Sequence, residues 1–499
     1  MNNLLFIPVA IAYFLVTGLL FLYGLNFLYL TYRSLREAPE KGPLQPSKKS
    51  WPRVTVQLPI FNEMYVAERL VNAACSLDYP KNRLEIQVLD DSTDETFSIV
   101  QRAVRAAKAR GFEIKHIHRK DRTGYKAGAL RDGFQTAKGE FFAIFDADFI
   151  PQPGFLKQTL PHFADPKIAF VQTRWGHVNR DFSFLTVLQS LSIDAHFMVE
   201  QLARSHSGLW FNFNGTAGIW RQDAIQEAGG WRADTLTEDL DLSYRAFLKG
   251  WRARFLSTVE TPAELPITFN AFRRQQHRWA RGSLECAIRL LPQIWSSRFP
   301  LRTKVSSTFH LTGYGVHLLL FIYCLMQPFV ITLAREFPAL ISLFSISFLF
   351  SLTTLAPSLF LFAGQYKLGR PWWRWLPVIL FISSFGAGMM LNTVRAALEV
   401  INRKPGEFRR TPKFGVGAKT KAWMKQKYHL ALDPIVYWEM AFAALNFFSM
   451  ALSIAAGYLL VAVFTGLFAF GLTFTSLYTI SQTFNIARIQ RAAALSESG

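Results

Sequence analysis

Long uncharged segments at both ends of the chain constrain its fold more than any other feature. Residues 4–32 carry no charged side chain and are followed by Arg33 and Arg36. Further apolar stretches lie at about 306–333, 339–363, 376–398, 435–456 and 458–480. Each is close to the ~20 residues that a membrane-spanning helix needs. We therefore expect an integral, multi-pass membrane protein with one globular domain inserted between the first apolar segment and the rest.

The basic charge of the chain fits membrane flanks better than nucleic-acid binding. The net charge is +20, and the basic residues crowd beside the apolar segments, as they do in cytoplasmic loops. We expect no nucleic-acid partner, because no nucleic-acid module is recognisable. The three cysteines, Cys75, Cys286 and Cys324, lie too far apart for a disulfide framework or a metal-ligand spacing.

The orientation of the spans depends on the stretch 401–428, which is rich in Lys and Arg. If 376–398 crossed the membrane, this stretch would lie outside, against the positive-inside tendency. We therefore expect 376–398 to lie along the cytoplasmic face or to re-enter. This gives five crossings, an outer N-terminus and a cytoplasmic globular domain.

The globular region alternates between strand and helix patterns. Strand-forming residue types occupy 54–58, 84–89, 113–118, 141–145 and 168–173, and helical patterns lie between most of them. This alternation predicts a mainly parallel α/β sheet. No GxGxxG opens it, so the dinucleotide-fold signature is absent. A long helix is expected over 182–203.

Acidic pairs follow two of the expected strands. Asp90 and Asp91 end the second strand, and Asp146 and Asp148 follow the fourth. The carboxyl ends of parallel strands meet at one edge, where open α/β sheets bind ligands. Two carboxylates at this spacing can hold one hard cation and a diphosphate. Taken alone, Asp146 and Asp148 could equally be a solvated pair at a strand end.

Three later motifs each allow a functional and a structural interpretation. Residues 211–221, FNFNGTAGIWR, permit close approach of a hydroxyl-rich ligand, or form a turn before a strand. Thr237 precedes a helix with acids in its first turn, which is good capping chemistry by itself. Gln275, Arg278 and Trp279 share a helix face that suits a phosphate and a sugar ring, or a membrane-interface helix.

Together these motifs resemble the processive family 2 glycosyltransferases, which include the cellulose, chitin and hyaluronan synthases. The four motifs are Asp90/Asp91, Asp146-Ala147-Asp148, Thr237-Glu238-Asp239 and Gln275-Gln276-His277-Arg278-Trp279. The closest likeness is to the plant cellulose-synthase-like A and C proteins, through IQVLDDSTDET, GYKAGAL, FAIFDADF, VQTRW, FNGTAGIWR and QQHRW. The resemblance implies a GT-A type α/β domain, with a mostly parallel sheet and its nucleotide-sugar site at the carboxyl edge, inserted in an α-helical transmembrane bundle.

The resemblance also implies residue roles. Asp239 is the expected general base, and Asp146 and Asp148 are expected to hold Mg²⁺ or Mn²⁺. The expected nucleotide-sugar contacts are Glu63, Asp90, Asp91, Lys126, Asp146, Gln275 and Arg278. The expected acceptor contacts are Asn214, Gly215, Glu238 and Trp279. A partial match to the gating loop of cellulose synthase comprises Phe408, Thr411 and Lys413, with Arg410 in place of the family's Val.

The expected activity is that of an inverting hexosyltransferase. It would elongate and export a β-linked glycan, β-1,4 by resemblance, from GDP-mannose or UDP-glucose at the bacterial plasma membrane or the Golgi membrane. One alternative is a lipid-directed transferase that adds one or few sugars, and a second is a non-catalytic membrane transporter or scaffold. The partners are then the donor, the growing glycan and the lipid bilayer, while accessory subunits are not predicted.

The expected division of the chain follows from the same features. It comprises a first transmembrane helix (1–36), a linker (37–52), the catalytic domain (53–265), interface helices (266–304), two transmembrane helices (305–364), an interfacial or re-entrant segment (365–400), the gating-type loop (401–432), two further transmembrane helices (433–482) and a cytoplasmic tail (483–499).

Overall fold

A seven-stranded mixed sheet forms the centre of the globular domain in the computed structural model, which describes residues 3–37, 51–336, 352–416 and 422–497. The strand order is β3-β2-β1-β4-β6-β5-β7. The pairs β1–β2, β2–β3, β1–β4 and β5–β7 are parallel, and β6 runs antiparallel to β4 and β5. The strands are β1 (Val54–Ile60), β2 (Leu84–Asp90), β3 (Glu113–His118), β4 (Phe141–Ile144), β5 (Ile168–His177), β6 (Gly218–Arg221) and β7 (Arg252–Ala263).

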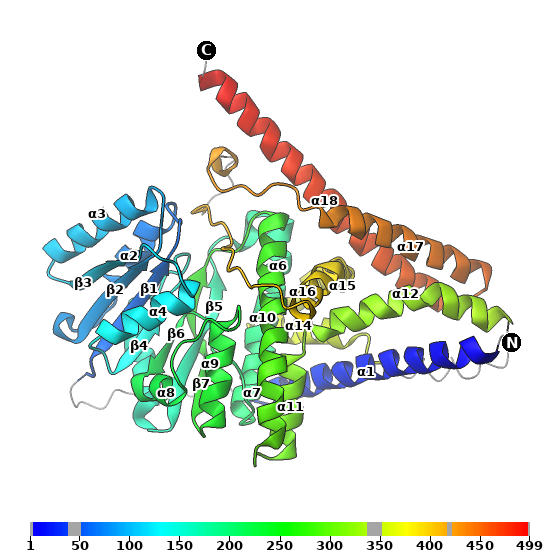
Figure 1. Ribbon diagram of the computed structural model, residues 1–499, viewed down its shortest axis with the longest axis horizontal. Coiled ribbons are helices and arrows are strands. Elements are labelled where there is room, and N and C mark those ends of the chain that lie inside the picture. Colours follow the sequence, from blue (N-terminus) through cyan, green and yellow to red (C-terminus); the bar gives the residue numbers. More distant parts are fainter. Residues whose placement is uncertain (1–2, 38–50, 337–351, 417–421, 498–499) are drawn as a thin grey trace.

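The sheet is buried on both faces, which explains the nearly continuous apolar runs of its central strands. Every residue of β1 and β2 is buried. One core packs α2 and α3 against the sheet, with Leu70 and Val100 fully buried. The opposite core brings α4, α8, α9 and α10 together around Trp220. The domain therefore has three layers, which Figure 1 shows at its left.

Helices α2, α3, α4, α9 and α10 lie where helical patterns were expected, whereas α5 and α8 were not expected. The helices of the domain are α2 (Ala67–Ala74), α3 (Thr96–Ala109), α4 (Tyr125–Thr136), α5 (Phe155–Thr159), α8 (Gln222–Glu227), α9 (Glu238–Leu248) and α10 (Phe269–Ser296). Short 3₁₀ segments occur at η1 (Lys81–Arg83), η2 (Leu160–Ala164), η3 (Arg180–Phe182), η5 (Trp372–Trp375) and η6 (Ala422–Lys425).

The helix expected over 182–203 is not uniform. It consists of α6 (Phe184–Ala195), a π-helical turn η4 (His196–Gln201) and α7 (Leu202–His206). Ser183 and Thr186 form a reciprocal capping box at the start of α6. These elements pack against α1 (Asn3–Arg36) and α14 (Ala356–Lys367), so they join the domain to the apolar helices.

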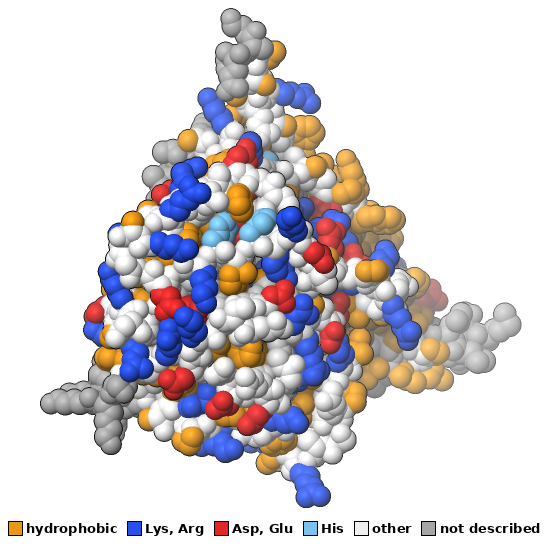
Figure 2. Space-filling view, turned by 60° about the vertical axis from the view of Figure 1, so that its left-hand side comes forward, with side chains coloured by type: hydrophobic (Ala, Val, Ile, Leu, Met, Phe, Trp, Pro, Cys, Tyr) orange, Lys and Arg blue, Asp and Glu red, His pale blue; other side chains and the backbone are white. Residues whose placement is uncertain are grey.

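Five of the described helical stretches are long and apolar enough to cross a membrane: Ile7–Arg36, Gly315–Glu336, Trp372–Ile401, Ile435–Ala455 and Leu459–Leu495. They belong to α1, α12 (Gly315–Glu336), α15 (Leu376–Ala387) with α16 (Met390–Ile401), α17 (Ile435–Ala455) and α18 (Leu459–Glu497). They extend to one side of the sheet domain in Figure 1. Figure 2 shows mixed charges over the domain and hydrophobic side chains gathered over these helices. This is the build of a multi-pass membrane protein.

Some details of the expected spans change. The stretch 306–333 is not one helix, because α11 (Leu301–Leu311) ends before α12 begins. The stretch 376–398 is also broken, between α15 and α16 near Gly388. The linker expected at 37–52 and the span at 339–363 lie largely outside the described residues, as do positions 417–421 of the basic stretch. The number of crossings and their orientation stay predictions.

Candidate active site

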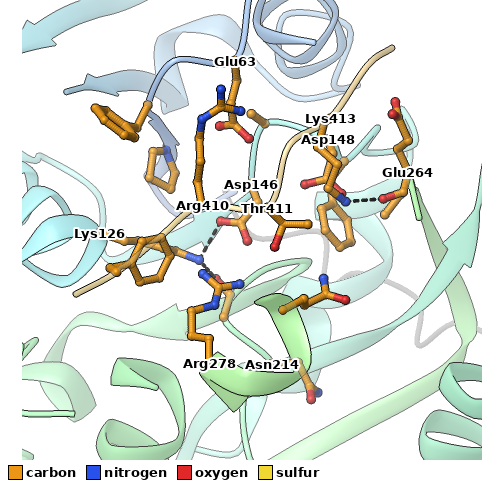
Figure 3. Close-up of a pocket in the computed structure, with 18 of the residues that line it drawn as sticks. Glu63, Lys126, Asp146, Asp148, Asn214, Glu264, Arg278, Arg410, Thr411 and Lys413 are labelled. Atoms are coloured by element: carbon orange, nitrogen blue, oxygen red, sulfur yellow. Dashed lines mark hydrogen bonds and ion pairs between the residues drawn. The ribbon is translucent and has the colours of Figure 1, made fainter. Parts of the chain in front are cut away.

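A solvent-connected cavity of about 160 Å³ lies at the carboxyl edge of the sheet. All the expected site residues except Asp90 line it, although they come from positions as distant as 63 and 413. Figure 3 shows several of them converging from the ends of β1 and β4, from α10 and from the loop after α16. The sheet edge therefore gathers the separate motifs into one site.

Asp146 and Asp148 each carry a lysine partner. Lys126 Nζ lies 2.6 Å from Asp146 Oδ1, and Lys413 Nζ lies 2.6 Å from Asp148 Oδ2. The backbone N–H of Asp146 donates to Thr216 Oγ1 at 2.9 Å, which fixes the start of the turn. Two carboxylates one residue apart offer the oxygen ligands that Mg²⁺ and Mn²⁺ prefer, so the donor set fits either ion.

Lys126, in the first turn of α4, connects the acidic motifs. Its ammonium group also donates to the carbonyl of Gly215 at 2.9 Å and lies 3.7 Å from Glu238 Oε1. Burial alone would lower the pKa of Lys126, but Asp146 and Glu238 outweigh it and raise the pKa above its usual value. Lys126 therefore stays charged in the cavity.

Asp239 is a carboxylate whose pKa favours proton exchange near neutrality. Burial raises its pKa to about 7, the neighbouring Glu238 adds to this, and Lys126 opposes it. Its Oδ1 accepts the backbone N–H of Leu240 at 2.9 Å. The expected capping by Thr237 is wrong in one respect: Thr237 holds the N-cap position, but its side chain makes no cap bond and instead lies 3.5 Å from Cys286 Sγ.

Gly215 allows the cavity to close around Asp239. Its φ is +78°, a left-handed conformation that side chains disfavour. A Cβ atom at this position would lie 3.0 Å from Asp239 Oδ2 and 3.3 Å from Lys126 Nζ. The turn before β6 thus needs a glycine both for its backbone and for the space beside the carboxylate.

Two lining residues, Arg410 and Glu264, were not assigned roles from the sequence, whereas Glu63 was expected to contact the donor. Burial raises the pKa of Glu63 to about 7, and the guanidinium of Arg410 opposes this. Glu264 follows β7 directly, and its Oε1 accepts the backbone N–H of Phe414 at 2.9 Å. Its position at a strand's carboxyl end was the available signal, but the strand itself was not predicted.

The basic loop after α16 is inserted into the cavity. Phe408 stacks on Tyr125 with ring centroids 6.2 Å apart, and the Arg278 guanidinium lies 4.3 Å from the Phe408 ring centre. Lys413 donates to the backbone carbonyl of Glu264 as well as to Asp148. The Thr411 hydroxyl is buried and makes no hydrogen bond with the described residues. An unsatisfied hydroxyl at this place is suited to bind a polar ligand.

The remaining expected contacts come from α10. Gln275, Arg278 and Trp279 line the cavity on one side of this helix, as their spacing predicts. Trp279 lies near Trp175, with ring centroids 6.4 Å apart. An aromatic wall beside an arginine is thus present next to the carboxylates.

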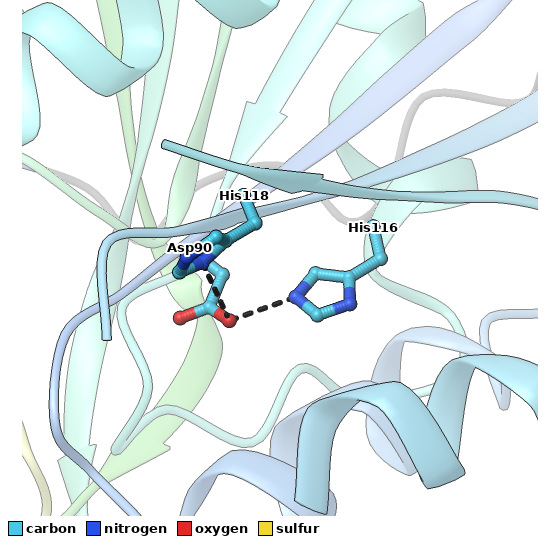
Figure 4. A group of neighbouring side chains, drawn as sticks. All are labelled: Asp90, His116 and His118. Atoms are coloured by element: carbon cyan, nitrogen blue, oxygen red, sulfur yellow. Dashed lines mark hydrogen bonds and ion pairs between the residues drawn. The ribbon is translucent and has the colours of Figure 1, made fainter. Parts of the chain in front are cut away.

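Asp90 lies apart from the cavity and belongs to a second cluster, which Figure 4 shows. Its Oδ2 lies 2.7 Å from His116 Nε2 and 3.6 Å from His118 Nδ1. Burial disfavours ionisation, but hydrogen bonds from His116 and Ser92 outweigh it and hold the pKa of Asp90 below its usual value. One ligand atom from each of the three residues lies within 4.8 Å of the others. Of the acidic pair, only Asp91 lines the cavity, and Arg119 pairs with it at 2.6 Å.

Comparison with known proteins agrees with this site. Residues 52–282 match the family described as "Glycosyltransferase like family 2". Residues 52–282 form a family 2 glycosyltransferase domain. The expected recognition is thereby confirmed, as is the GT-A type sheet with apolar helices beside it.

Two curated relatives with substantial identity come from a plant. Glucomannan 4-beta-mannosyltransferase 9 of Arabidopsis thaliana is 41% identical over 300 residues, covering 58% of this chain and 56% of its own. Glucomannan 4-beta-mannosyltransferase 2 of the same plant is 48% identical over 238 residues, covering 47% and 45%. The chain therefore spans about half the length of the curated relatives it matches.

A solved structure supports the fold. A mannosyltransferase from Pyrobaculum calidifontis, in complex with GDP-mannose and Mn²⁺, superimposes with a TM-score of 0.52 and 21% identity. The match covers 80% of this chain and 100% of that one. At this identity the likeness carries the fold of the domain and no further detail.

Proposed function

We propose that this chain is an inverting hexosyltransferase that adds mannose from GDP-mannose to a growing β-1,4-linked mannan or glucomannan. The observation that carries the proposal is the partly buried Asp239, with a pKa of about 7, in the same cavity as Asp146 and Asp148. The names of the plant relatives favour mannosyl transfer over glucosyl transfer. UDP-glucose remains the alternative donor that the assay below distinguishes.

The proposed chemistry begins at the acceptor hydroxyl. As this hydroxyl attacks the anomeric carbon, it must lose its proton, and the Asp239 carboxylate takes it. The bond to the diphosphate breaks on the opposite side in the same displacement, so an α-linked donor gives a β-glycoside. Trp279 provides an aromatic surface for the acceptor ring, and Gly215 leaves room for it beside Asp239.

The leaving diphosphate needs positive charge as it departs. Asp146 and Asp148 would hold a divalent ion, Mg²⁺ or Mn²⁺, which supplies charge stabilisation to the phosphate oxygens when bound. Lys126 and Arg278 add fixed cationic groups in the cavity, and Thr411 offers a hydroxyl donor. Lys126 and Lys413 pair with these two carboxylates. Their ammonium groups therefore lie close enough to form ion pairs with the phosphate oxygens of a bound donor.

Product analysis tests the proposal directly. The purified protein in nanodiscs would receive radiolabelled GDP-mannose or UDP-glucose, each with Mg²⁺ or Mn²⁺. We expect a polymer from GDP-mannose that an endo-β-1,4-mannanase degrades, and none from the Asp239→Asn variant. A single-sugar product that partitions into organic solvent would contradict polymer synthesis and favour a lipid acceptor. A polymer from UDP-glucose alone would contradict the donor assignment.

A further inference from the structure

A second cavity lies beside the active site, separated from it by Arg278 and Leu236, which line both. Its volume is about 500 Å³. Its walls come from α10, from α16 and from the segments that lead into and out of the basic loop. The lining residues that carry charge are Arg274, Arg278, Arg281, Arg395, Glu399, Lys404, Glu407, Arg409 and Asp433. We call it the basic cavity.

The acids of the basic cavity are each matched by an arginine. Arg281 lies 3.0 Å from Glu399, Arg395 lies 3.0 Å from Asp433, and Arg409 lies 2.8 Å from Glu407. This pairing leaves Arg274, Arg278 and Lys404 without an ion-pair partner within the described part of the chain. Arg278 also lines the active site, so Arg274 and Lys404 are the two uncompensated cations that line the basic cavity alone.

Arg274 is a partly buried cation with other guanidinium groups nearby. Burial lowers its pKa, and the nearby guanidinium groups of Arg409 and Arg410 lower it further. Arg274 and Arg278 are four residues apart on α10, so their side chains lie on one face of the helix. A guanidinium group such as that of Arg274 can bind two phosphate oxygens in a bidentate manner.

The charge of the basic cavity indicates the class of ligand. One phosphate monoester carries about −1.5 to −2 at neutral pH. The lining of the basic cavity has six cationic and three anionic side chains, and this net charge of +3 matches two linked phosphate groups better than one. Position is informative too, because the candidate spans Trp372–Ile401 and Ile435–Ala455 adjoin the cavity at Arg395 and Asp433. A ligand could therefore reach it from solution or from the headgroup layer.

We propose that the basic cavity binds a diphosphate-bearing anion, distinct from the sugar donor, and that this anion holds the loop segment 404–413 against α10. Lys404 and Arg409 line the cavity on the loop side, whereas Arg274 faces them from the helix. An anion between the two walls would replace the repulsion between Arg274 and Arg409 with two attractions. Since Thr411 and Lys413 follow directly on the same segment, the bound anion would favour the inserted loop. The binding claim does not depend on the proposed sugar transfer.

Pyrophosphate, without metal or nucleotide, is the probe for this site. Calorimetric titration would use the full-length protein carrying Lys126→Gln, which removes a cation of the active site. We expect retained binding that Arg274→Gln and Lys404→Gln each weaken about tenfold, the loss typical of a charge-assisted hydrogen bond. Both positions lie outside the active-site lining, and neither side chain bridges helices, so folding should persist. Arg289→Gln, on the exposed face of α10, is the matched control and should bind as before.

Unchanged pyrophosphate binding in both variants, or no pyrophosphate binding at all by the Lys126→Gln protein, would overturn the proposal that the basic cavity binds an anion. The loop claim has its own readout: pyrophosphate should slow amide hydrogen exchange in 404–413, and Arg274→Gln should abolish the effect. Equal exchange with and without pyrophosphate would overturn that claim. Nanodiscs with and without diacylglycerol pyrophosphate, a lipid that carries two linked phosphates, separate the sources. A lipid occupant predicts weaker pyrophosphate binding in the anionic discs, and a soluble occupant predicts equal binding.

Discussion

At the scale of single residues, Asp239 is the group whose replacement should separate chemistry from binding. Asp239→Asn keeps the shape of the side chain but removes the proton acceptor. We expect turnover to fall by about 10²–10⁴-fold, the usual contribution of a general base, while GDP-mannose binding by calorimetry stays within a few-fold of the wild type. Asp234→Asn, at the surface, is the control. Equal loss of donor binding would contradict the assignment of Asp239 as the base.

The pH dependence of turnover follows from the same carboxylate. Burial and Glu238 raise the pKa of Asp239 to about 7, so the ionised, proton-accepting form is lost as the pH falls below that value. We expect kcat/KM to rise about tenfold per pH unit below 7 and to level off above it. A profile that is flat between pH 5.5 and 8 would mean that another group accepts the proton.

The contribution of Asp239 to the stability of the protein should fall as the pH rises, whereas turnover rises. A carboxyl with a raised pKa in the folded state holds its proton there between about pH 4 and pH 7 but releases it on unfolding, so its contribution to stability declines as the pH rises. Asp239→Asn should therefore raise the unfolding midpoint at pH 8 and have little effect at pH 4. The upper limit of the gain is about 4 kcal/mol from the shift in pKa. A variant that is less stable than the wild type at pH 8 would contradict this account.

Gly215 provides a steric test of the same site. Gly215→Ala places a methyl group 3.0 Å from Asp239 Oδ2 in a backbone conformation with a φ of +78°. We expect a loss of about 1 kcal/mol in stability and a larger loss of turnover, because Asp239 and Lys126 must move. Gly111, with a φ of +83° and no atom near its would-be Cβ, is the matched control. Equal turnover in the two alanine variants would show that the space beside Asp239 does not matter.

At the scale of elements, the loop after α16 competes with the expected metal ion. Lys413 Nζ lies 2.6 Å from Asp148 Oδ2, so an ion bound to Asp148 has to displace an ammonium group. We expect Lys413→Ala to tighten Mn²⁺ binding without donor severalfold, by calorimetry, yet to slow turnover with donor. Thr411→Ala should slow turnover without changing Mn²⁺ binding, and the exposed Lys425 provides the control substitution. Wild-type turnover in both loop variants would remove the gating role.

The elements also show how far the sequence alone could predict this molecule. Strands such as β1 and β2 were predicted because burial on both faces requires continuous apolar runs. Strand β7 was missed, since its exposed start carries two arginines and Pro262 lies near its end. Glu264 was therefore missed with it. The inward position of Arg410 could not be predicted either, because it depends on how the loop folds back over a domain more than a hundred residues away.

At the scale of the whole molecule, a buried polar network fastens the glycosyltransferase domain to the apolar helices. Arg273 of α10 and Glu439 of α17 are both fully buried, with Arg273 Nη2 2.9 Å from Glu439 Oε2. Ser476 of α18 donates to the same oxygen at 3.1 Å, and Asn392 of α16 donates to the Arg273 carbonyl at 3.0 Å. Four helices thus meet immediately before Gln275, the first residue of α10 that lines the active-site cavity.

This network predicts that removing one charge of the Arg273–Glu439 pair destabilises the protein more than removing both. Arg273→Met leaves a buried carboxylate without its partner, which typically costs about 3–5 kcal/mol, whereas replacing both charges by apolar groups is often neutral. We expect a large drop in the unfolding midpoint in detergent for Arg273→Met, recovered for the most part in Arg273→Met with Glu439→Met. Arg289→Met, exposed on the same helix, should leave the midpoint unchanged. If the double variant were as unstable as the single one, the hydrogen bonds of Arg273 to neighbouring helices, and not its charge, would hold the domain in place.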